Sequence, residues 1–343
     1  MRVAQIAPPW APVPPHLYGG IELVVDLLSR GLQAAGHEVV LWTVGESTSP
    51  VPRRSVLEFA EGSRIGMAVP ELRHVIHAYD SLTDFDVIHD HTVFGPLYAA
   101  RFPERVVVTT NHGPFGTELD DLYRTVARQV PVICISHDQR ALAPEIPVAR
   151  VIHHGVDPAT FPIGAGRGGY CLFLGRMSPD KGAHRAIVAC RKAGVPILLA
   201  AKMREPREHE YFEAEVAPLL GEGAEYLGEV PHERKLELLG GAMALVNPIR
   251  WHEPFGLLMV EALACGTPVI AFREGAAPEI VADGRTGFLC DDEAGMADAI
   301  SRIGGISRDA CRAEAEGYFS SARMVAEHVE LYEELIARRS GLV

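Results

Sequence analysis

The amino-acid sequence predicts an α/β protein of two doubly wound domains, each with a parallel sheet covered by helices on both faces. Three observations support this prediction. Short apolar runs alternate with segments of helical periodicity, the alternation stops at a stretch rich in glycine and proline, and it then resumes. Runs that are apolar on both faces and separated by helices are typical of buried parallel strands. The chain of 343 residues is also longer than one hydrophobic core usually supports.

The first half of the chain contains the strands and helices of one such domain. Apolar runs predict strands at residues 2–7, 38–42, 86–89, 105–110 and 131–135. Between the first two runs, leucines and valines recur at helical spacing over residues 22–35, and Gly36 is expected to end that helix. Residues 1–158 are therefore predicted to form the first domain.

The second half repeats the pattern after the break at residues 161–169. Predicted strands follow at residues 170–174, 196–201, 224–227, 242–247 and 268–272, so residues 159–318 are predicted to form the second domain. Open parallel sheets bind ligands at the carboxyl ends of their strands. We therefore expect the two domains to face each other across a cleft that is lined by the motifs that follow strands.

Charge and composition exclude several classes of protein. The formal net charge of −13 and the absence of a dense lysine and arginine run argue against a nucleic-acid partner and against strong membrane association. The first residues lack the apolar core of a signal peptide, and no segment approaches the length of a membrane span, so a cytoplasmic protein is expected. The six cysteines are scattered through mostly apolar runs, which is typical of buried thiols and not of a zinc site.

Residues 175–182 read Gly-Arg-Met-Ser-Pro-Asp-Lys-Gly and join a predicted strand to a predicted helix. Arg176, Lys181 and the amino end of that helix supply positive charge of the kind that neutralises a diphosphate without a metal ion. A surface turn with incidental charges is the plainer alternative, because glycine and charged residues are ordinary loop components.

Two carboxylates, Glu253 and Glu261, stand eight positions apart where a helix is expected to open. On a helix, eight residues advance roughly 12 Å and turn about 80° past two full rotations, so both side chains can still reach one groove. The pair is therefore predicted to face one groove and to hold two ends of one ligand. Charged residues on a helix are more often simply solvated, so the neighbouring motifs decide between these interpretations.

Five motifs occur in order within residues 170–290, and together they resemble the nucleotide-sugar-binding half of glycosyltransferase family four, whose members are retaining enzymes of the GT-B fold. The motifs are Gly-Arg-x4-Lys-Gly at 175–182, the two glutamates, Ala-x-Gly-Thr-Pro-Val-Ile-Ala at 264–271, Gly-x2-Pro-Glu at 275–279 and Asp-Gly-x2-Gly-Phe-Leu at 283–289. The first half adds Gly19-Gly20 and His112, each after a predicted strand. Near the junction, His154 stands where family members usually carry asparagine, which weakens any role for that position.

The resemblance implies a role for each of these residues. Arg176 and Lys181 would hold the diphosphate and stabilise the charge that develops on it as the bond to the sugar breaks. Glu253 would bind sugar hydroxyls and Glu261 ribose hydroxyls. His112 would orient the donor sugar at the reacting carbon, although many loop histidines are only structural. Further donor contacts are expected from Gly19, Gly20, Leu227, Val230, Phe255, Gly256 and Leu257, and further sugar or acceptor contacts from His89, His91, His137 and His252.

No metal site is expected. Asp84 and Asp86 imitate the acidic pair of metal-dependent glycosyltransferases, but their position just before an apolar run favours a turn at the entry of a strand. The resemblance also implies that a terminal helix, within residues 319–343, packs back on the first domain.

The expected activity is therefore a metal-independent, retaining transfer of a sugar from a nucleoside diphosphate sugar, with UDP as the favoured nucleotide and no cofactor. The expected acceptor is a soluble carbohydrate or a secondary metabolite. A nucleotide-sugar epimerase and a sugar-nucleotide-binding protein without catalysis remain as alternatives. An NAD-dependent dehydrogenase is disfavoured, because Gly19-Gly20 does not complete a Gly-x-Gly-x-x-Gly turn.

Overall fold

The computed structural model describes residues 1–17 and 19–341 of the chain. The chain divides into two compact units, one formed by Met1–His154 with Ser321–Val343 and the other by Gly155–Ser320. Each unit contains one parallel sheet and its own cluster of buried apolar side chains. The prediction of two doubly wound α/β domains is confirmed.

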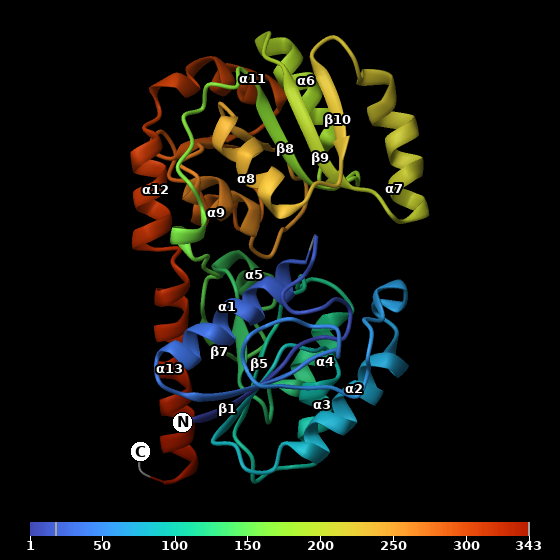
Figure 1. Ribbon diagram of the computed structural model, residues 1–343, viewed down its shortest axis with the longest axis vertical. Helices are drawn as coiled ribbons and strands as arrows, with labels where there is room; N and C mark the ends of the chain where they lie inside the picture. The colour runs from blue at the N-terminus through green and yellow to red at the C-terminus, as the bar shows by residue number, and fades with distance from the viewer. Residues whose placement is uncertain (18, 342–343) are drawn as a thin grey trace. The chain divides into compact units, whose positions relative to one another are not determined.

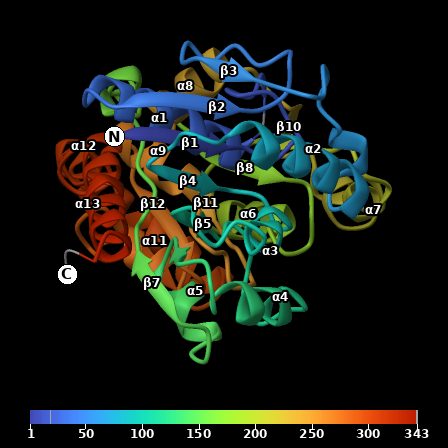
Figure 2. The ribbon, with the colours of Figure 1, turned by 90° about the horizontal axis from the view of Figure 1, so that it is seen from below.

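The sheet of the first unit has seven strands in the order β3-β2-β1-β4-β5-β6-β7, and Figure 2 shows β3, β2, β1 and β4 side by side. The strand order reverses between β1 and β4, so the loops that follow these two strands meet at the point where open α/β sheets bind ligands. The strands are β1 (Arg2–Ile6), β2 (Glu38–Trp42), β3 (Arg53–Arg54), β4 (Val87–Asp90), β5 (Val107–Thr110), β6 (Val132–Cys134) and β7 (Val148–Val151).

Two long helices from opposite ends of the sequence pack together in the first unit, α1 (Gly20–Ala34) and α13 (Ser321–Arg339). They approach so closely that a Cβ atom at Gly31 would lie 2.4 Å from the side chain of Val325. Tyr332 of α13 is fully buried and hydrogen-bonds to Gln5 of β1. The C-terminal helix thus completes the first unit; of the predicted terminal segment, residues 342 and 343 lie outside the described part of the chain. The remaining helices are α2 (Ala68–Ser81), α3 (Gly95–Ala99), α4 (Leu119–Val126) and α5 (His137–Leu142).

The second unit has a six-stranded sheet in the order β10-β9-β8-β11-β12-β13. Its central strands are apolar on both faces because helices cover both, and all four residues of β12 are buried. The strands are β8 (Cys171–Arg176), β9 (Ile197–Lys202), β10 (Ala224–Gly228), β11 (Leu245–Asn247), β12 (Val269–Phe272) and β13 (Gly287–Cys290). The helices are α6 (Ala183–Ala193), α7 (Pro206–Tyr211), α8 (His232–Gly241), α9 (Leu257–Ala264), α10 (Ala277–Ile280), α11 (Glu293–Arg302) and α12 (Arg308–Gly317).

Strands β3, β7 and β13 are not predicted from the sequence. Strands β3 and β7 lie at opposite edges of their sheet and have no fully buried residue, and neither has the apolar run that marks the predicted strands. Strand β13 begins inside the motif at 283–289, where a turn comes first. The turn closes with a hydrogen bond from Thr286 N to Ala282 O (2.9 Å), and the strand follows it at once.

Three smaller predictions can be compared with the described residues. All six cysteines are buried free thiols, as predicted. Asp86 accepts a hydrogen bond from the backbone of Arg2 (2.7 Å) just before β4 begins, which agrees with a turn at the entry of a strand. Over residues 1–17 and 19–341, none of the helices has both the length and the apolar character needed to cross a bilayer.

Candidate active site

The predicted phosphate loop joins β8 to α6 in the second unit. Arg176 is the last residue of β8, and its guanidinium lies 3.6 Å from the carboxylate of Asp180. Lys181 comes just before the left-handed Gly182 that caps the amino end of α6, and only 8% of its side chain is exposed. The loop therefore combines a strand end, two cations and the positive end of a helix dipole, which is a favourable arrangement for an anion.

Lys181 forms an ion pair with Glu253, which lies on a distant loop of the same unit. The ammonium of Lys181 also lies 5.3 Å from the centre of the Trp251 ring. A cation that is this enclosed needs a charged partner, and the carboxylate supplies it. The pair places a group that can bind a phosphate oxygen next to a group that can accept hydrogen bonds from sugar hydroxyls.

Glu253 is not part of a helix, because α9 begins only at Leu257. The helical spacing that was expected to align Glu253 with Glu261 is therefore wrong. The backbone of Glu253 is held instead by the loop that follows β12. Ala276 N donates to Glu253 O (3.1 Å), and a Cβ atom at Gly275 would lie 2.5 Å from the nitrogen of Glu253. The Gly-x2-Pro-Glu motif thus begins with a glycine because a neighbouring backbone passes against it.

At the start of α9, as in any α-helix, the first N–H groups have no carbonyl of a preceding turn to bind, and Met259 N donates to Gly256 O at 2.9 Å. Gly256 is the N-cap with a left-handed φ of 93°, and a Cβ atom there would lie 2.5 Å from the Met259 side chain. Phe255 is buried, and Leu257 is the first residue of the helix. Amides at a helix start can bind an anion, and this segment is expected to contact the donor.

Glu261 lies on α9 with only 2% of its side chain exposed, and its carboxylate forms an ion pair with a lysine. Both of its carboxylate oxygens accept hydrogen bonds from Lys235 Nζ at 2.8 Å, and Lys235 belongs to α8. A carboxylate buried to this degree would be costly without such a partner. Lys235 holds Glu261 in place and leaves lone pairs on its oxygens for hydroxyl donors.

Leu227 and Val230, two of the residues expected to contact the donor, lie at the end of β10 in the second unit. Leu227 is inside the strand and Val230 lies two residues beyond it. Between them, Glu229 binds the guanidinium of Arg204, with the closest oxygen at 2.6 Å. This ion pair links the segment that is expected to contact the donor to the loop after β9.

Gly19 and Gly20 lie at the start of α1 in the first unit, as expected for a loop that approaches a ligand. A Cβ atom at Gly20 would meet nothing within 4 Å, whereas one at Gly19 would lie 2.6 Å from Pro15. Glu22, in the first turn of the same helix, is buried, and its burial raises its pKa to about 7. A carboxyl group that is partly protonated at neutral pH therefore lies beside the glycine pair.

His112 lies in the loop after β5 in the first unit, and the backbone on both sides of it is fixed. Gln139 of α5 donates from Nε2 to the carbonyls of Asn111 (2.9 Å) and Gly113 (2.6 Å). The Oε1 atom of Gln139 in turn accepts from Ile135 N at 2.7 Å. A single amide side chain, buried and fully bonded, thus positions the histidine.

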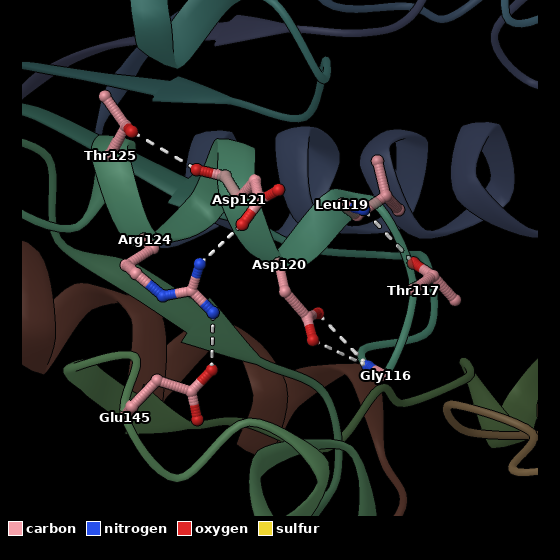
Figure 3. A network of polar contacts seen from close by, with 8 residues as sticks. All are labelled: Gly116, Thr117, Leu119, Asp120, Asp121, Arg124, Thr125 and Glu145. Carbon is pink, nitrogen blue, oxygen red and sulfur yellow. Dashed lines mark hydrogen bonds and ion pairs between the residues drawn. The ribbon is translucent and has the colours of Figure 1, made fainter.

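The loop that follows His112 is tied to α4 by exposed polar contacts (Figure 3). Gly116 N donates to both carboxylate oxygens of Asp120, at 3.1 and 3.2 Å. Arg124 then binds Asp121 (2.5 Å) and Glu145 (2.9 Å). Exposed ion pairs of this kind contribute little stability, and they set the course of the loop more than they strengthen the fold.

The imidazole of His112 belongs to a buried chain of hydrogen bonds that ends on the C-terminal helix. His112 Nε2 lies 2.9 Å from His91 Nδ1, and His91 Nε2 lies 2.8 Å from Gln5 Oε1. Gln5 Nε2 donates to the Tyr332 hydroxyl at 3.2 Å. Residues from β1, two strand-end loops and α13 are therefore connected through side chains alone.

A second branch of the same chain starts at Tyr332. Its hydroxyl lies 2.6 Å from His89 Nδ1, and His89 Nε2 lies 2.7 Å from Thr110 Oγ1. His89 is fully buried and bonded at both ring nitrogens, so the predicted contact of His89 with a sugar or acceptor is wrong. His154 stacks against His112 with ring centres 5.3 Å apart.

Burial lowers the pKa of every imidazole in this cluster. The pKa of His112 falls to about 3 and that of His328 to about 4. Burial also holds the pKa values of His89, His91 and His154 well below their usual range. These rings are consequently neutral at pH 7 and act through hydrogen bonds and not through charge.

Several of the contributing residues are not predicted from the sequence: Lys235, Gln5, Tyr332 and Gln139. Lys235 stands in a helical pattern with other charged residues, where lysine is normally solvated. Of these four residues, only Gln5 could have been noticed in the sequence. A polar amide inside an otherwise apolar strand is expected to be buried and therefore needs hydrogen-bond partners. The identity of those partners depends on tertiary contacts between segments more than eighty positions apart.

Comparisons with known proteins can be set beside this geometry. The family described as "Glycosyl transferases group 1" matches residues 165–310, and "Glycosyltransferase Family 4" matches residues 18–160. A glycogen synthase of Mycobacterium tuberculosis is 28% identical over 368 aligned residues, which cover 88% of this chain and 86% of that protein.

Two solved structures are similar over almost the whole chain. AviGT4, a glycosyltransferase involved in avilamycin A biosynthesis, is 29% identical with a TM-score of 0.78, and the match covers 98% of each chain. Alr3699/HepE of Anabaena, in complex with UDP and glucose, has a TM-score of 0.79 at 18% identity and covers 97% of this chain and 100% of its own. At that identity, the second likeness indicates the fold alone.

Proposed function

This chain belongs to glycosyltransferase family four and has the GT-B fold, and from that premise we propose that it transfers a sugar from a nucleoside diphosphate sugar to a hydroxyl group with retention at the anomeric carbon. The two family matches together span most of the chain, from residue 18 to residue 310. The donor would bind mainly to the second unit, which carries the phosphate loop and both glutamates.

The observation that carries this proposal is the Lys181–Glu253 pair at the start of α6. When the glycosidic bond breaks, negative charge develops on the leaving diphosphate, and a cation already fixed beside it stabilises that charge. Arg176 at the end of β8 adds a second cation. Glu253, held by the Gly275 loop, is available to accept hydrogen bonds from the sugar.

These cations are also the reason to propose a reaction without a metal ion. Arg176, Lys181 and the amino end of α6 supply positive charge at the diphosphate, which is the task that a divalent cation performs in metal-dependent enzymes. A retaining reaction would take place on one face of the sugar, with a diphosphate oxygen accepting the proton of the acceptor hydroxyl. This route requires no carboxylate nucleophile from the protein.

We propose UDP as the nucleotide, and a soluble carbohydrate or secondary metabolite as the acceptor. The choice of UDP rests on the family resemblance, in which UDP is the most frequent donor nucleotide. The involvement of AviGT4 in avilamycin A biosynthesis supports the choice of acceptor. The segment at Leu227 and Val230 would contact the base through its backbone, and a backbone contact accommodates more than one base.

Thermal shift of the purified protein against UDP, GDP, ADP and NAD, each with and without EDTA, tests the proposal. One nucleoside diphosphate is expected to raise the melting temperature, because a ligand that binds the folded state stabilises it. The shift should be insensitive to EDTA, absent in Lys181→Ala and unchanged in Lys192→Ala, which removes an exposed lysine from α6. Stabilisation by NAD alone would overturn the assignment. Anomeric NMR signals of the product made from the matching sugar nucleotide then test retention.

A further inference from the structure

The hydrogen bonds that connect His112 to Tyr332 run in one direction from donor to acceptor, and one residue determines that direction. A neutral imidazole carries one N–H, so each ring donates at one nitrogen and accepts at the other, and a tyrosine hydroxyl can do either. Gln5 is different, because its Nε2 atom can only donate and its Oε1 atom can only accept. The orientation of this one amide therefore fixes the proton positions of its neighbours.

The protons can be followed from Gln5 to His112. Gln5 Oε1 faces His91 Nε2, so the proton of the neutral His91 ring is on Nε2. His91 Nδ1 is then an acceptor, and the group that donates to it is the Nε2–H of His112. In the neutral state His112 consequently has no proton on Nδ1. None of the described residues makes a hydrogen bond to that nitrogen, and His112 is only half-buried.

The other branch agrees with the same direction. Gln5 Nε2 donates to the Tyr332 hydroxyl, which is thereby free to donate its own proton to His89 Nδ1. His89 then carries its proton on Nε2 and donates to Thr110 Oγ1. Each of the linking groups donates once and accepts once along the chain, so the printed distances fit one consistent direction of donation.

We propose that Gln5 is a positioning residue that keeps the proton of His112 on Nε2, so that His112 presents Nδ1 as a hydrogen-bond acceptor for a hydroxyl of the donor sugar. Gln5 itself is fully buried and acts only through His91. The low pKa of His112, which burial depresses to about 3, supports the neutral state on which this depends. The tautomer of His112 does not depend on the proposed function. Only the contact between His112 and the donor sugar rests on that function.

Nitrogen NMR of protein labelled with 15N-histidine tests the proposal, because protonated and unprotonated ring nitrogens give distinct signals. The signals of His112 are assigned by their loss in His112→Asn. In the wild type, a protonated Nε2 and an unprotonated Nδ1 are expected for His112. Gln5→Met keeps the length of the side chain but removes the acceptor for His91, so both tautomers of His112 are expected to appear.

Gln5→Glu is the matched control. A carboxylate can only accept, so His91 keeps its proton on Nε2 and His112 keeps its wild-type tautomer. Tyr332 must now donate to residue 5, and His89 is expected to move its proton to Nδ1. A wild-type His112 protonated on Nδ1, or a tautomer unchanged in Gln5→Met, would overturn the proposal. Circular dichroism of each variant verifies that it is folded.

Kinetics separate this inference from the proposed function. In Gln5→Met, kcat should fall roughly two- to tenfold, the worth of one hydrogen bond, and in Gln5→Glu it should recover. The affinity for the nucleoside diphosphate should stay unchanged, since Gln5 lies in the other unit from the phosphate loop. A changed tautomer with unchanged kcat would refute the sugar contact. The expected tautomers without any sugar transfer would refute the proposed function and leave the role of Gln5 intact.

Discussion

The buried polar side chains that are hydrogen-bonded to His112, directly or through one another, in the first unit are neutral, whereas those around Lys181 in the second unit are charged. In the first unit, buried imidazoles, an amide and a phenol satisfy one another through hydrogen bonds. In the second unit, two glutamates from either side of the start of α9 each pair with a lysine, Lys181 with Glu253 and Lys235 with Glu261. Both arrangements avoid an unpaired buried group, and they do so by different means.

The difference corresponds to the ligand chemistry proposed for each unit. A diphosphate carries charge, and more of it develops as the bond to the sugar breaks, so fixed cations are useful beside it. Sugar hydroxyls are neutral, and they are distinguished by which partner donates and which accepts. A neutral chain of defined direction supplies that information without an electrostatic field. The comparison predicts that variants in the second unit change charge stabilisation, while variants in the first unit change geometry and proton position.

The largest effect is expected for Lys181→Ala. Loss of a cation that stabilises the leaving diphosphate should lower kcat by roughly 100- to 1,000-fold, as for other groups that stabilise charge in a transition state. Steady-state kinetics with the donor identified by thermal shift measures it. Lys192→Ala is the control, since it removes an exposed lysine of the same helix. A turnover close to that of the wild type would mean that Lys181 only pairs with Glu253.

The next effect concerns pH and a buried acid of the first unit. Asp90 is fully buried and accepts hydrogen bonds from Thr92 and from the Tyr79 hydroxyl. Burial raises its pKa from 3.8 to about 7, so between these pH values the folded state holds a proton that the unfolded chain has lost. The free energy of unfolding should therefore fall as the pH rises through this window, by roughly 4 kcal/mol in total.

Thermal unfolding of the wild type and of Asp90→Asn, from pH 4 to pH 8, measures this contribution. Asn keeps the shape of the side chain and does not titrate, so the variant should lose that part of the pH dependence. Glu22 and Glu71 are also buried acids with raised pKa values, and the difference between the two proteins isolates Asp90 from them. Parallel pH curves for both proteins would show that Asp90 is already ionised in the folded state.

The parts of the site that follow from local pattern were predictable from the sequence. The phosphate loop, for example, has its glycines and cations within eight consecutive residues after an apolar run, so both its position and its charge could be predicted. The spacing of Glu253 and Glu261 was misleading for a local reason. The left-handed Gly256 starts α9 later than the carboxylate pattern suggests, and Glu253 is placed by the Gly275 loop instead.

A third prediction concerns Lys235 and the affinity for the donor. Lys235→Met retains the apolar stem of the side chain but leaves the buried Glu261 without its cation. Glu261 should then reorient or take up a proton, and the nucleoside diphosphate should bind roughly tenfold more weakly, about the worth of one charge-assisted hydrogen bond. Isothermal titration calorimetry measures the change. Lys235→Arg preserves the charge and is expected to retain most of the affinity; equal weakening in both variants would point to packing and not to charge.

The hydrogen-bonded chain of the first unit could not be predicted from sequence, although its members are visible there. Gln5, His91 and Tyr332 lie on segments that only the completed sheet and the returning C-terminal helix bring together. With fifteen histidines in the chain, composition alone cannot tell a ligand-facing ring from a buried one. His89 shows the consequence, since it was expected to contact a sugar and is instead enclosed in the core.

The smallest effect is expected for Thr110→Val, at the far end of that chain. Thr110 Oγ1 is the acceptor for the Nε2–H of His89, and valine has the same shape without the oxygen. The buried N–H would lose its partner, which should lower the free energy of unfolding by about 1 kcal/mol. Thr110→Ser keeps the hydroxyl and should cost less, and thermal unfolding of the two variants measures the difference.

The effect of salt should also differ between the two units. Because the bond between His89 and Thr110 joins two neutral groups, its contribution to stability should not change with ionic strength. The difference in nucleotide affinity between Lys235→Met and Lys235→Arg should become smaller as salt is added. A salt-dependent loss in Thr110→Val would mean that His89 carries a charge, and the contrast between the two units would then fail.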